Sequence, residues 1–392
     1  MTSRASASPT FVGYRRPDGR AGVRNHVLIL SPTGLTSAAA RRVASLVAGT
    51  IAVTSGYGRG QVGDDAALHA RTLTGLAMHP NVAAAVVLAA ADDLLRPYVQ
   101  ALEAVGTPVV GISLPNVHED VLALVDVGTR AAARLVRDAS ALRREPFPVS
   151  SLCLAVECGH SDATSGVVCN PLVGRMVDRI VSAGGTAMFS ETAEWTGAEH
   201  LLAARAADGD VARRIAAAVQ ARERVARAAG TELRAQNVGA QNKAGGITTL
   251  EEKALGAIAK GGRQTIRGVL AAAERAPGPG LWLMDTPYFS PESITAMVAG
   301  GAQIVVFTTG AGNSYASRVA PTLKVSANPA TVARLAEQID FDASAALDGR
   351  ASLDALALAG VERLVDVASG ALTFGEILGE GDEVVSRLSS SI

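Results

Sequence analysis

Aromatic residues, cysteines and lysines are scarce in this chain of 392 residues. Aromatic residues make up 4% of it against 48% apolar residues, so its core must be built from alanine, valine, leucine and isoleucine. The three cysteines, Cys153, Cys158 and Cys169, cannot form a disulfide framework and suit a reducing compartment.

Long apolar runs and a strong charge imbalance are also absent. No apolar run approaches the length of a membrane span, so we expect no membrane partner. The first residues, MTSRASASPT, lack the hydrophobic core of a signal peptide. We therefore expect residues 1–10 to be a disordered lead and the protein to be cytoplasmic. A formal net charge of −1 argues against a nucleic-acid partner held by bulk electrostatics.

Short apolar runs alternate with stretches of helical spacing, which predicts an α/β fold with mostly parallel sheets flanked by helices. We expect two units, residues 11–145 and 146–392, the second Rossmann-like and ending in C-terminal helices. The charged, proline-containing stretch 143–148 is expected to link them. One helix is expected over 200–229 and an amphipathic helical tail over 353–388.

The first unit is rich in arginine before its first strand and in glycine after its second. Arg24 belongs to a group of arginines within residues 15–24, and arginine forks grip carboxylates and phosphates. A solvated turn with structural ion pairs explains this group equally well. The loop SGYGRGQVGDD carries Arg59, Gln61 and Asp64, and its glycines let backbone amides approach a ligand closely. It matches neither a Walker loop nor the dinucleotide-binding fingerprint.

The most informative stretch is 152–199. Directly after the apolar run 151–156 stand Glu157, Cys158, His160, Ser161 and Asp162. The next predicted strand, in GGTAMFSE, ends in Glu191. Polar residues at strand ends lie where open α/β sheets bind ligands, so we expect these side chains at one edge. The alternative is that Asp162 or Ser161 only caps a helix and that Glu191 is solvated.

Two later stretches offer further binding groups. A glycine-containing loop carries Asn242 and Lys243 and is expected to close over an anionic substrate, unless Lys243 is simply a surface lysine. The strand 303–307 ends in Thr308 and Thr309, whose hydroxyl groups stand where ligands bind.

Many ordered motifs make the chain resemble the altronate/galactarate dehydratase family of sugar-acid lyases over almost its full length. They are GYRRPDGRAGVRN, GQVGDD, HPNV, ECGHSDATSG, NPLVGRMVDRIVSAGGTAMFSET, GAEHLL, NKAGGITTLEEKALGAIAKGG, MDTP, AGGAQIVVFTTGAGN and a late Asn328-Pro329 pair.

The resemblance implies a cytoplasmic lyase that removes water or sulfite from a hydroxylated acid with a divalent metal, iron or manganese. Full-length members carry a small N-terminal SAF domain that has no counterpart here. The chain is thus similar to the large part of a split enzyme, such as the sulfolactate sulfo-lyases. We therefore expect a small SAF-domain subunit as a partner, a small anionic substrate and a homo-oligomer.

The chain departs from the family pattern at expected metal ligands. Family members usually show a His-x-x-x-Cys pair before the GQ-x-GDD segment, where this chain has Ser55 and Arg59. A second family cysteine is replaced by Asp92. Since thiolate and imidazole are the ligands that hold iron, we do not expect an iron–sulfur cluster at these positions. The expected ligands of a single divalent metal are Asp92, Glu157 and Cys158.

A dehydratase needs a base for the proton next to the carboxylate, an acid for the leaving hydroxide and stabilisation of an enediolate-like transition state. The candidates for acid and base are His160, Asp162, Glu191 and Lys243. The candidates for substrate binding are Arg24, Arg59, Gln61, Asp64, Ser161, Asn242, Thr308 and Thr309. Two alternatives remain: a metal-independent lyase or isomerase on another anionic substrate, and a non-catalytic binding subunit of a split dehydratase complex.

Overall fold

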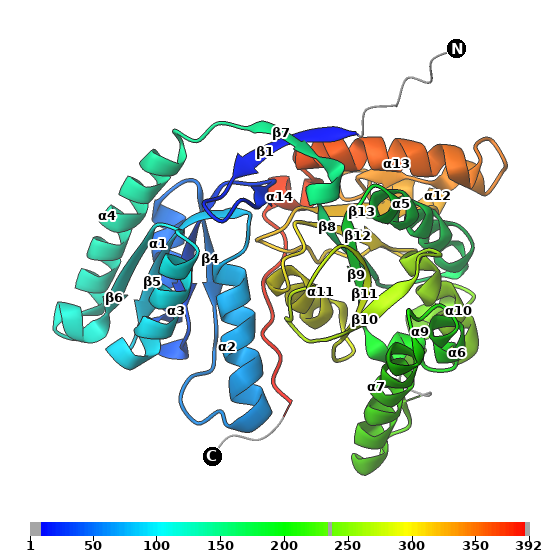
Figure 1. The fold of residues 1–392 in the computed structure, drawn as a ribbon, viewed down its shortest axis with the longest axis horizontal. Coiled ribbons are helices and arrows are strands. Elements are labelled where there is room, and N and C mark those ends of the chain that lie inside the picture. The colour runs from blue at the N-terminus through cyan, green and yellow to red at the C-terminus, as the bar shows by residue number, and fades with distance from the viewer. Residues whose placement is uncertain (1–8, 234–236, 389–392) are drawn as a thin grey trace.

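The computed structural model describes residues 9–233 and 237–388 (Figure 1). Residues 1–8 of the predicted disordered lead lie outside this part of the chain, and Thr10 already begins the first strand. The predicted α/β class is confirmed, because parallel sheets flanked by helices make up the bulk of the described residues. The division into two units near residue 145 stays a prediction.

The first unit is built on a parallel sheet with strand order β4-β3-β5-β6. Its strands are β3 (His26–Ser31), β4 (Thr50–Thr54), β5 (Val82–Ala89) and β6 (Val109–Ser113). Its helices are α1 (Gly34–Leu46), α2 (Gly63–Ala77), α3 (Asp92–Ala104), η1 (Leu114–Val117) and α4 (Val121–Ala139). All residues of β5 are buried, as expected for a strand covered on both faces.

The second unit is built on a larger parallel sheet with strand order β10-β11-β9-β8-β12-β13-β14. Its strands are β8 (Cys153–Cys158), β9 (Thr186–Phe189), β10 (Ile266–Ala271), β11 (Gly280–Asp285), β12 (Ile304–Thr308), β13 (Thr322–Ser326) and β14 (Phe341–Asp342). The chain leaves β8 to one side for β9 and returns on its other side as β12. Ligands bind at such a switch in strand order, beyond the carboxyl ends of the strands.

Helices cover both faces of this sheet. The longer ones are α5 (Asn170–Ser182), α7 (Gly209–Ala228), α10 (Leu250–Ile258), α11 (Ser290–Ala299) and α13 (Leu353–Ala368). The shorter ones are η2 (Val149–Ser151), η3 (Ser165–Cys169), η4 (Thr192–Trp195), α6 (Glu199–Ala203), α9 (Ala240–Ala244), η5 (Ala259–Gly261), α12 (Pro329–Arg334), η6 (Ser344–Ala346) and α14 (Phe374–Leu378). The prediction of one helix over 200–229 is wrong, because α6 ends at Ala203 and Asp208 caps a new helix.

The stretch 143–148, which is predicted to link the two units, contains β7 (Glu145–Pro148), and β7 pairs antiparallel with β1 (Thr10–Arg15). Its role as the link stays a prediction. β1 also pairs with β2 (Ala21–Gly22). Figure 1 shows β1 and β7 crossing above both sheets. The strands pair because the charged stretch carries Phe147, which is buried and stacks on Phe11 with ring centroids 5.8 Å apart.

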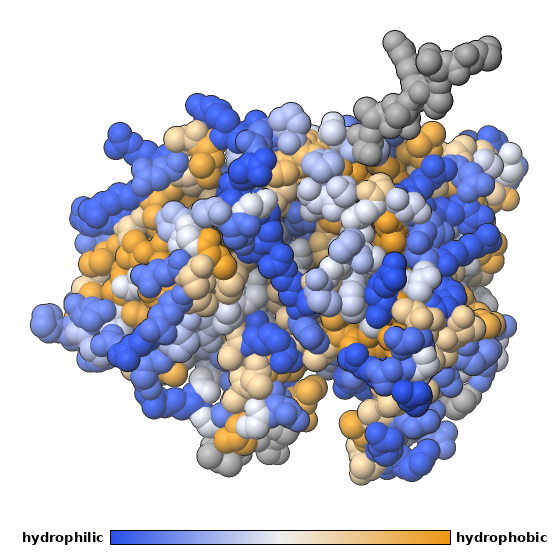
Figure 2. Space-filling view, viewed as in Figure 1, coloured by the Kyte–Doolittle hydropathy of each residue, from blue (hydrophilic) through white to orange (hydrophobic). Residues whose placement is uncertain are grey.

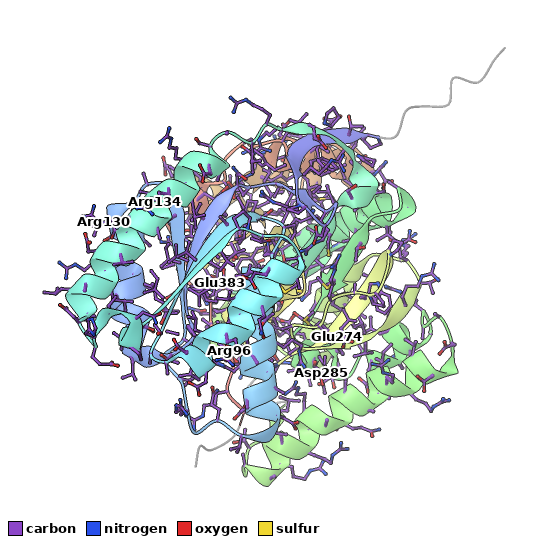
Figure 3. All side chains as sticks on the ribbon, turned by 60° about the vertical axis from the view of Figure 1, so that its left-hand side comes forward. Arg96, Arg130, Arg134, Glu274, Asp285 and Glu383 are labelled. Carbon is purple, nitrogen blue, oxygen red and sulfur yellow. The ribbon has the colours of Figure 1, made fainter. Side chains whose placement is uncertain are left out.

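The tail prediction is also partly wrong, because helix ends at Leu378 and the following residues, through Leu388, run extended between the two units (Figure 1). Glu383 anchors this segment by accepting hydrogen bonds from Ser317 Oγ at 2.6 Å and Thr295 Oγ1 at 3.0 Å. Figure 3 shows Glu383 deep inside the molecule, whereas Arg130 and Arg134 point outward from α4. The backbone N–H of Leu388 then donates to Asp65 on α2, at 2.6 Å.

The two units share an apolar core. It joins Leu28 and Leu73 of the first unit to Met297 and Phe307 of the second. Helix α2 lies so close to α11 that a Cβ on Gly75 would stand 2.3 Å from the carbonyl oxygen of Ala299. Figure 2 shows an indentation at the lower edge between the left and right parts of the molecule. No helix within the described ranges is long and apolar enough to cross a membrane.

Candidate functional site

The carboxyl ends of β8 and β9 bring together a buried group of charged side chains. Glu157 and Cys158 are the last residues of β8, and Glu191 and Glu194 follow β9. Register places Glu157 beside Phe307 of β12, at the switch in strand order. The helix that follows this edge begins with a π-helical turn, η3, a distortion that often accompanies functional sites.

Glu157 is fully buried and each of its oxygens has partners. Oε1 accepts from the backbone N–H of Cys158 at 3.0 Å and from Lys260 Nζ at 2.9 Å. Oε2 accepts from Ser190 Oγ at 3.1 Å and Ser293 Oγ at 2.5 Å. Because a buried carboxyl group is costly unless its oxygens are paired, these bonds make Glu157 a structural anchor of the site.

Lys260 lies at the centre of the group. Its ammonium also donates to Cys158 Sγ at 3.2 Å and to Glu194 Oε2 at 2.7 Å, so all three of its N–H donors are used. The Lys260 side chain is only 1% exposed. Although burial lowers the pKa of Lys260, the neighbouring Cys158, Glu157 and Glu194 raise it well above its ordinary value.

Lys253, on α10, is the second buried cation of this group. Its ammonium donates to the backbone oxygen and to Oδ1 of Asn237 at 2.8 and 2.9 Å, and lies 3.4 Å from Glu194 Oε1. It also stands 4.9 Å from the centre of the Tyr288 ring. Burial raises the pKa of Glu194, but Lys260 and Lys253 together bring it down to about 2.

Glu191 differs from its neighbours because its Oε1 is buried and has no hydrogen-bond partner among the described residues. Burial and the charges of Glu157 and Glu194 raise the pKa of Glu191 well above its ordinary value, which favours its neutral form. Its backbone is left-handed, with φ of 56°, which is uncommon for a residue other than glycine. Such strain clusters at functional sites.

A cavity of about 430 Å³ opens onto this group. Its walls include Cys158, His160, Glu191, Glu194, Lys253 and Tyr288. A volume of this size suits a small organic acid. The cavity therefore places Glu191, whose Oε1 has no partner among the described residues, and the buried cation Lys253 beside space for an anionic ligand.

His160 stands at the exposed rim of the cavity, also with a left-handed backbone, at φ of 51°. Its Nδ1 lies 2.8 Å from the carbonyl oxygen of Gly312. Because a carbonyl only accepts, Nδ1 must carry the proton, and Nε2 of a neutral ring keeps a lone pair. His160 Nε2 can thus take up a proton.

The structure contains a buried Glu-Cys-Glu group that could hold a metal ion. Glu157, Cys158 and Glu194 each offer one ligand atom, and these atoms lie within 4.8 Å of one another. The same three side chains, however, accept the three hydrogen bonds of Lys260. The donor set therefore fits a metal ion only if the ammonium leaves. Asp92 does not belong to this group; it accepts from Ser113 Oγ in the first unit.

Several predicted site residues of the second unit have structural partners instead. Asp162 Oδ1 accepts from the backbone N–H of Ser165 at 3.0 Å and from Thr164 Oγ1 at 2.7 Å, and its Oδ2 accepts from Asn328 Nδ2 at 2.8 Å. These bonds fit the alternative interpretation of Asp162, in which its side chain caps the start of the following helix. Thr308 Oγ1 donates to Asn170 Oδ1, and Thr309 Oγ1 accepts from the backbone N–H of Gly312.

Ser161 and Asn242 do line the cavity, and Asn242 Nδ2 donates to the backbone oxygen of Ser161 at 2.9 Å. This bond ties α9 to the loop after β8. Lys243, by contrast, is exposed and is not among the residues that line the cavity. The alternative interpretation, a surface lysine, describes its position.

The predicted residues of the first unit lie apart from this cavity. Arg24 is buried, and its guanidinium binds Glu376 and the backbone oxygens of residues 23, 367 and 371, which leaves it no donor for a substrate. Arg59 is exposed and pairs with Asp93 at 2.8 Å. Asp64 is exposed in the first turn of α2, and Gln61 Nε2 is buried with no partner in the described part of the chain.

Arg59 lines a separate cavity of about 400 Å³ whose walls come only from the first unit. Ser55, at a position where the resemblance implies histidine, is buried, and its Oγ lies 2.8 Å from His69 Nε2. The expectation that Arg59 binds the substrate's anionic group stays a prediction.

The sequence analysis missed Glu194, Lys253 and Lys260 as site residues. The chain has four lysines, and three of them are buried. Lys253 and Lys260 are seven residues apart, which is two helical turns and therefore one face. In a chain so poor in lysine, this spacing was the available signal.

Comparison with known proteins gives matches along nearly the whole described chain. The family described as D-galactarate/altronate dehydratase, C-terminal, matches residues 149–391, and D-galactarate dehydratase/altronate hydrolase, second domain, matches residues 13–140. The (2R)-sulfolactate sulfo-lyase subunit beta of Chromohalobacter salexigens is 40% identical over 97% of this chain and 98% of its own length. The altronate dehydratases of Escherichia coli and Bacillus subtilis are each 31% identical over 93% of this chain and 74% of their own length. These matches confirm the resemblance that the motifs indicated.

Proposed function

We propose that this chain, which belongs to the D-galactarate/altronate dehydratase family, is a lyase that eliminates water from a small hydroxylated carboxylate, a sugar acid or a related hydroxy acid. The family makes it a dehydratase-type lyase acting on an anionic substrate. The observation that carries the specific proposal is Glu191, a buried carboxyl with a raised pKa and an unpaired Oε1, beside a cavity that fits such a substrate.

Glu191 supplies the general acid in this proposal. Hydroxide is a poor leaving group and needs a proton as the carbon–oxygen bond breaks. Burial and the neighbouring carboxylates raise the pKa of Glu191, so this group keeps its proton to a higher pH than an exposed glutamate would. The unpaired Oε1 leaves the carboxyl free to bond to a substrate hydroxyl.

His160 supplies the base and Lys253 the positive charge. His160 Nε2 takes the proton from the carbon next to the carboxylate, and those two electrons form the carbon–carbon double bond. The hydroxyl on the neighbouring carbon leaves with the Glu191 proton as water, and the enol product then tautomerises to a 2-oxo acid. The Lys253 ammonium, whose contact with Glu194 is long at 3.4 Å, stabilises the negative charge that develops on the substrate carboxylate.

No step in this proposal passes through a metal. Iron or manganese, which the family resemblance implies, would find ligands in Glu157, Cys158 and Glu194. These side chains, however, already accept hydrogen bonds from the Lys260 ammonium. An arrangement in which the metal displaces Lys260 would add Lewis-acid stabilisation of the substrate carboxylate.

The partner, the assembly and the location are part of the same proposal. A relative of nearly equal length is called a subunit beta, which supports a separate small SAF-domain subunit for this chain. We expect that subunit to bind together with a homo-oligomer of this chain in the cytoplasm. Neither a nucleic acid nor a membrane enters the proposal.

The test is turnover of a panel of aldonates, aldarates and sulfolactate by the purified chain, with and without a small SAF-domain protein. Turnover is measured as the formation of a 2-oxo acid. The proposal predicts a 2-oxo acid from at least one hydroxy acid, and loss of that activity in Glu191→Gln but not in Glu362→Gln, an exposed residue on α13. Binding of a hydroxy acid without turnover under every condition would favour the non-catalytic binding subunit.

A further inference from the structure

The three candidate metal ligands already share one cation. Lys260 Nζ lies 2.9 Å from Glu157 Oε1, 3.2 Å from Cys158 Sγ and 2.7 Å from Glu194 Oε2. An ammonium has three hydrogen atoms, so these three bonds exhaust its donors. The ammonium stands where an ion bridging the three ligand atoms would stand.

The backbone that carries Lys260 is tightly packed, so its side chain has little room to withdraw. A Cβ on Gly174 of α5 would lie 2.2 Å from the carbonyl oxygen of Ala259. A Cβ on Gly261 would lie 2.4 Å from the Phe189 ring. Helix α5 and strand β9 therefore press on both neighbours of Lys260, whose side chain is 1% exposed.

The charges of the buried group also argue against an added metal ion. Lys260 and Lys253 face Glu157 and Glu194, which gives two positive and two negative charges with hydrogen bonds among them. A divalent ion added to this group would stand beside two buried ammonium groups, where charge repulsion is only weakly screened.

We infer that the Lys260 ammonium takes the place of a metal ion in this site and holds Glu157, Cys158 and Glu194 in position. This is a positioning role: Lys260 touches the anchoring side chains and does not line the cavity. The inference does not rest on the proposed substrate or reaction.

Cobalt(II) is a suitable probe, because a cobalt–thiolate bond gives a near-ultraviolet charge-transfer absorption that reports Cys158 directly. Wild type, Lys260→Ala, Lys260→Ala/Cys158→Ser and Lys324→Ala are incubated with cobalt(II) and freed of excess metal. Absorption, cobalt content and thermal unfolding are then measured. Lys324 is the matched control, a buried lysine that pairs with Glu380 elsewhere in the fold.

Wild type and Lys324→Ala are expected to show no thiolate absorption. Lys260→Ala is expected to bind about one equivalent of cobalt, with the absorption and with a cobalt-dependent rise in melting temperature. The double variant is expected to lose the absorption. If Lys260→Ala does not fold without metal, refolding in cobalt gives the same readout.

Thiolate absorption in the wild type would overturn the inference, since the ammonium would not be excluding the ion. Folded Lys260→Ala without the absorption would overturn it as well, since the three side chains would not form a metal site. The experiment measures neither activity nor the effect of a chelator. Its outcome therefore does not depend on whether the chain eliminates water from a substrate.

Discussion

At the carboxyl group of Glu191, burial and two neighbouring carboxylates act in the same direction. Each favours the neutral form, so the folded protein binds a proton that the unfolded chain releases above the ordinary pKa of 4.5. The contribution of Glu191 to the free energy of unfolding is fully present below that pH, and it falls as the pH rises toward the raised pKa. Glu191 thus lowers stability at neutral pH, as residues held for function commonly do.

Glu191→Gln is accordingly expected to raise the melting temperature at neutral pH and to leave it nearly unchanged at pH 4. The amide keeps the shape of the neutral carboxyl and cannot ionise. Thermal unfolding between pH 4 and pH 8 measures the difference, with Glu362→Gln as the control. Melting curves of wild type and Glu191→Gln that shift in parallel with pH would contradict a raised pKa.

Lys260 has the opposite effect on stability. Lys260→Met keeps an unbranched side chain of similar length but leaves Glu157 and Glu194 without their shared cation. Breaking a buried pair on one side costs about 3–5 kcal/mol. Denaturant unfolding checks this cost; Arg350→Met, which removes an exposed pair with Asp348, is expected to cost less than about 1 kcal/mol. Similar costs for the two variants would show that the Lys260 ammonium does not compensate the charges of Glu157 and Glu194.

Sequence alone predicted the anions of the site better than its cations. Glu157, Cys158 and Glu191 follow strands whose apolar runs end abruptly, so the rule for strand ends placed them correctly together. Lys253 and Lys260 lie in a helix and the turn after it, about a hundred residues further on, and only packing brings them back to β8. Asp162 obeys the same strand-end rule and yet serves as a helix cap, because the rule does not distinguish the two roles.

At the scale of elements, α10 carries Lys253 and begins with a capping box. Thr249 Oγ1 accepts from the backbone N–H of Glu252, and Glu252 accepts in return from the backbone N–H of Thr249. The sequence pattern Thr-Leu-Glu-Glu at residues 249–252 is typical of such a helix start. The position of the Lys253 ammonium in the site therefore depends on a local signal that lies outside the cavity.

Thr249→Ala is expected to destabilise the protein by about 1 kcal/mol and to lower kcat/KM. Ser352→Ala removes an N-cap of the same kind from α13, which is remote from the cavity. It is expected to cost a similar amount of stability with unchanged kinetics. Denaturant unfolding and steady-state kinetics on both variants separate the two effects, and equal kinetics would show that α10 does not position the site.

At the scale of the whole molecule, the two units act as one packed body through α2, α11 and the extended tail. Helix α11 is central, because Ser290 and Ser293 in its first turn bind Cys158 and Glu157, while its last turn packs on α2. Neither this packing nor the tail was predictable from periodicity, since the tail after Leu378 has no regular structure and is held by Glu383 and by backbone groups.

Gly75→Ala is expected to force α2 away from α11, because its Cβ would meet the Ala299 carbonyl at 2.3 Å. Overpacking of this kind costs about 1–3 kcal/mol. Gly209→Ala, in the first turn of α7 and with only ordinary contacts, is the control and is expected to be tolerated. Equal melting temperatures for the two variants would indicate that the helices separate without cost.

The most direct test of the account is the dependence of Glu191→Gln on the leaving group. Wild type and variant are compared, by kcat/KM, on a hydroxy acid and on the matching acid whose β-substituent departs as a stable anion, such as sulfite. If Glu191 protonates the leaving hydroxide, the variant loses about 10²- to 10⁴-fold on the hydroxy acid and much less on the second substrate. An equal loss on both substrates, or no loss on either, would contradict the role of Glu191 as the general acid of this lyase.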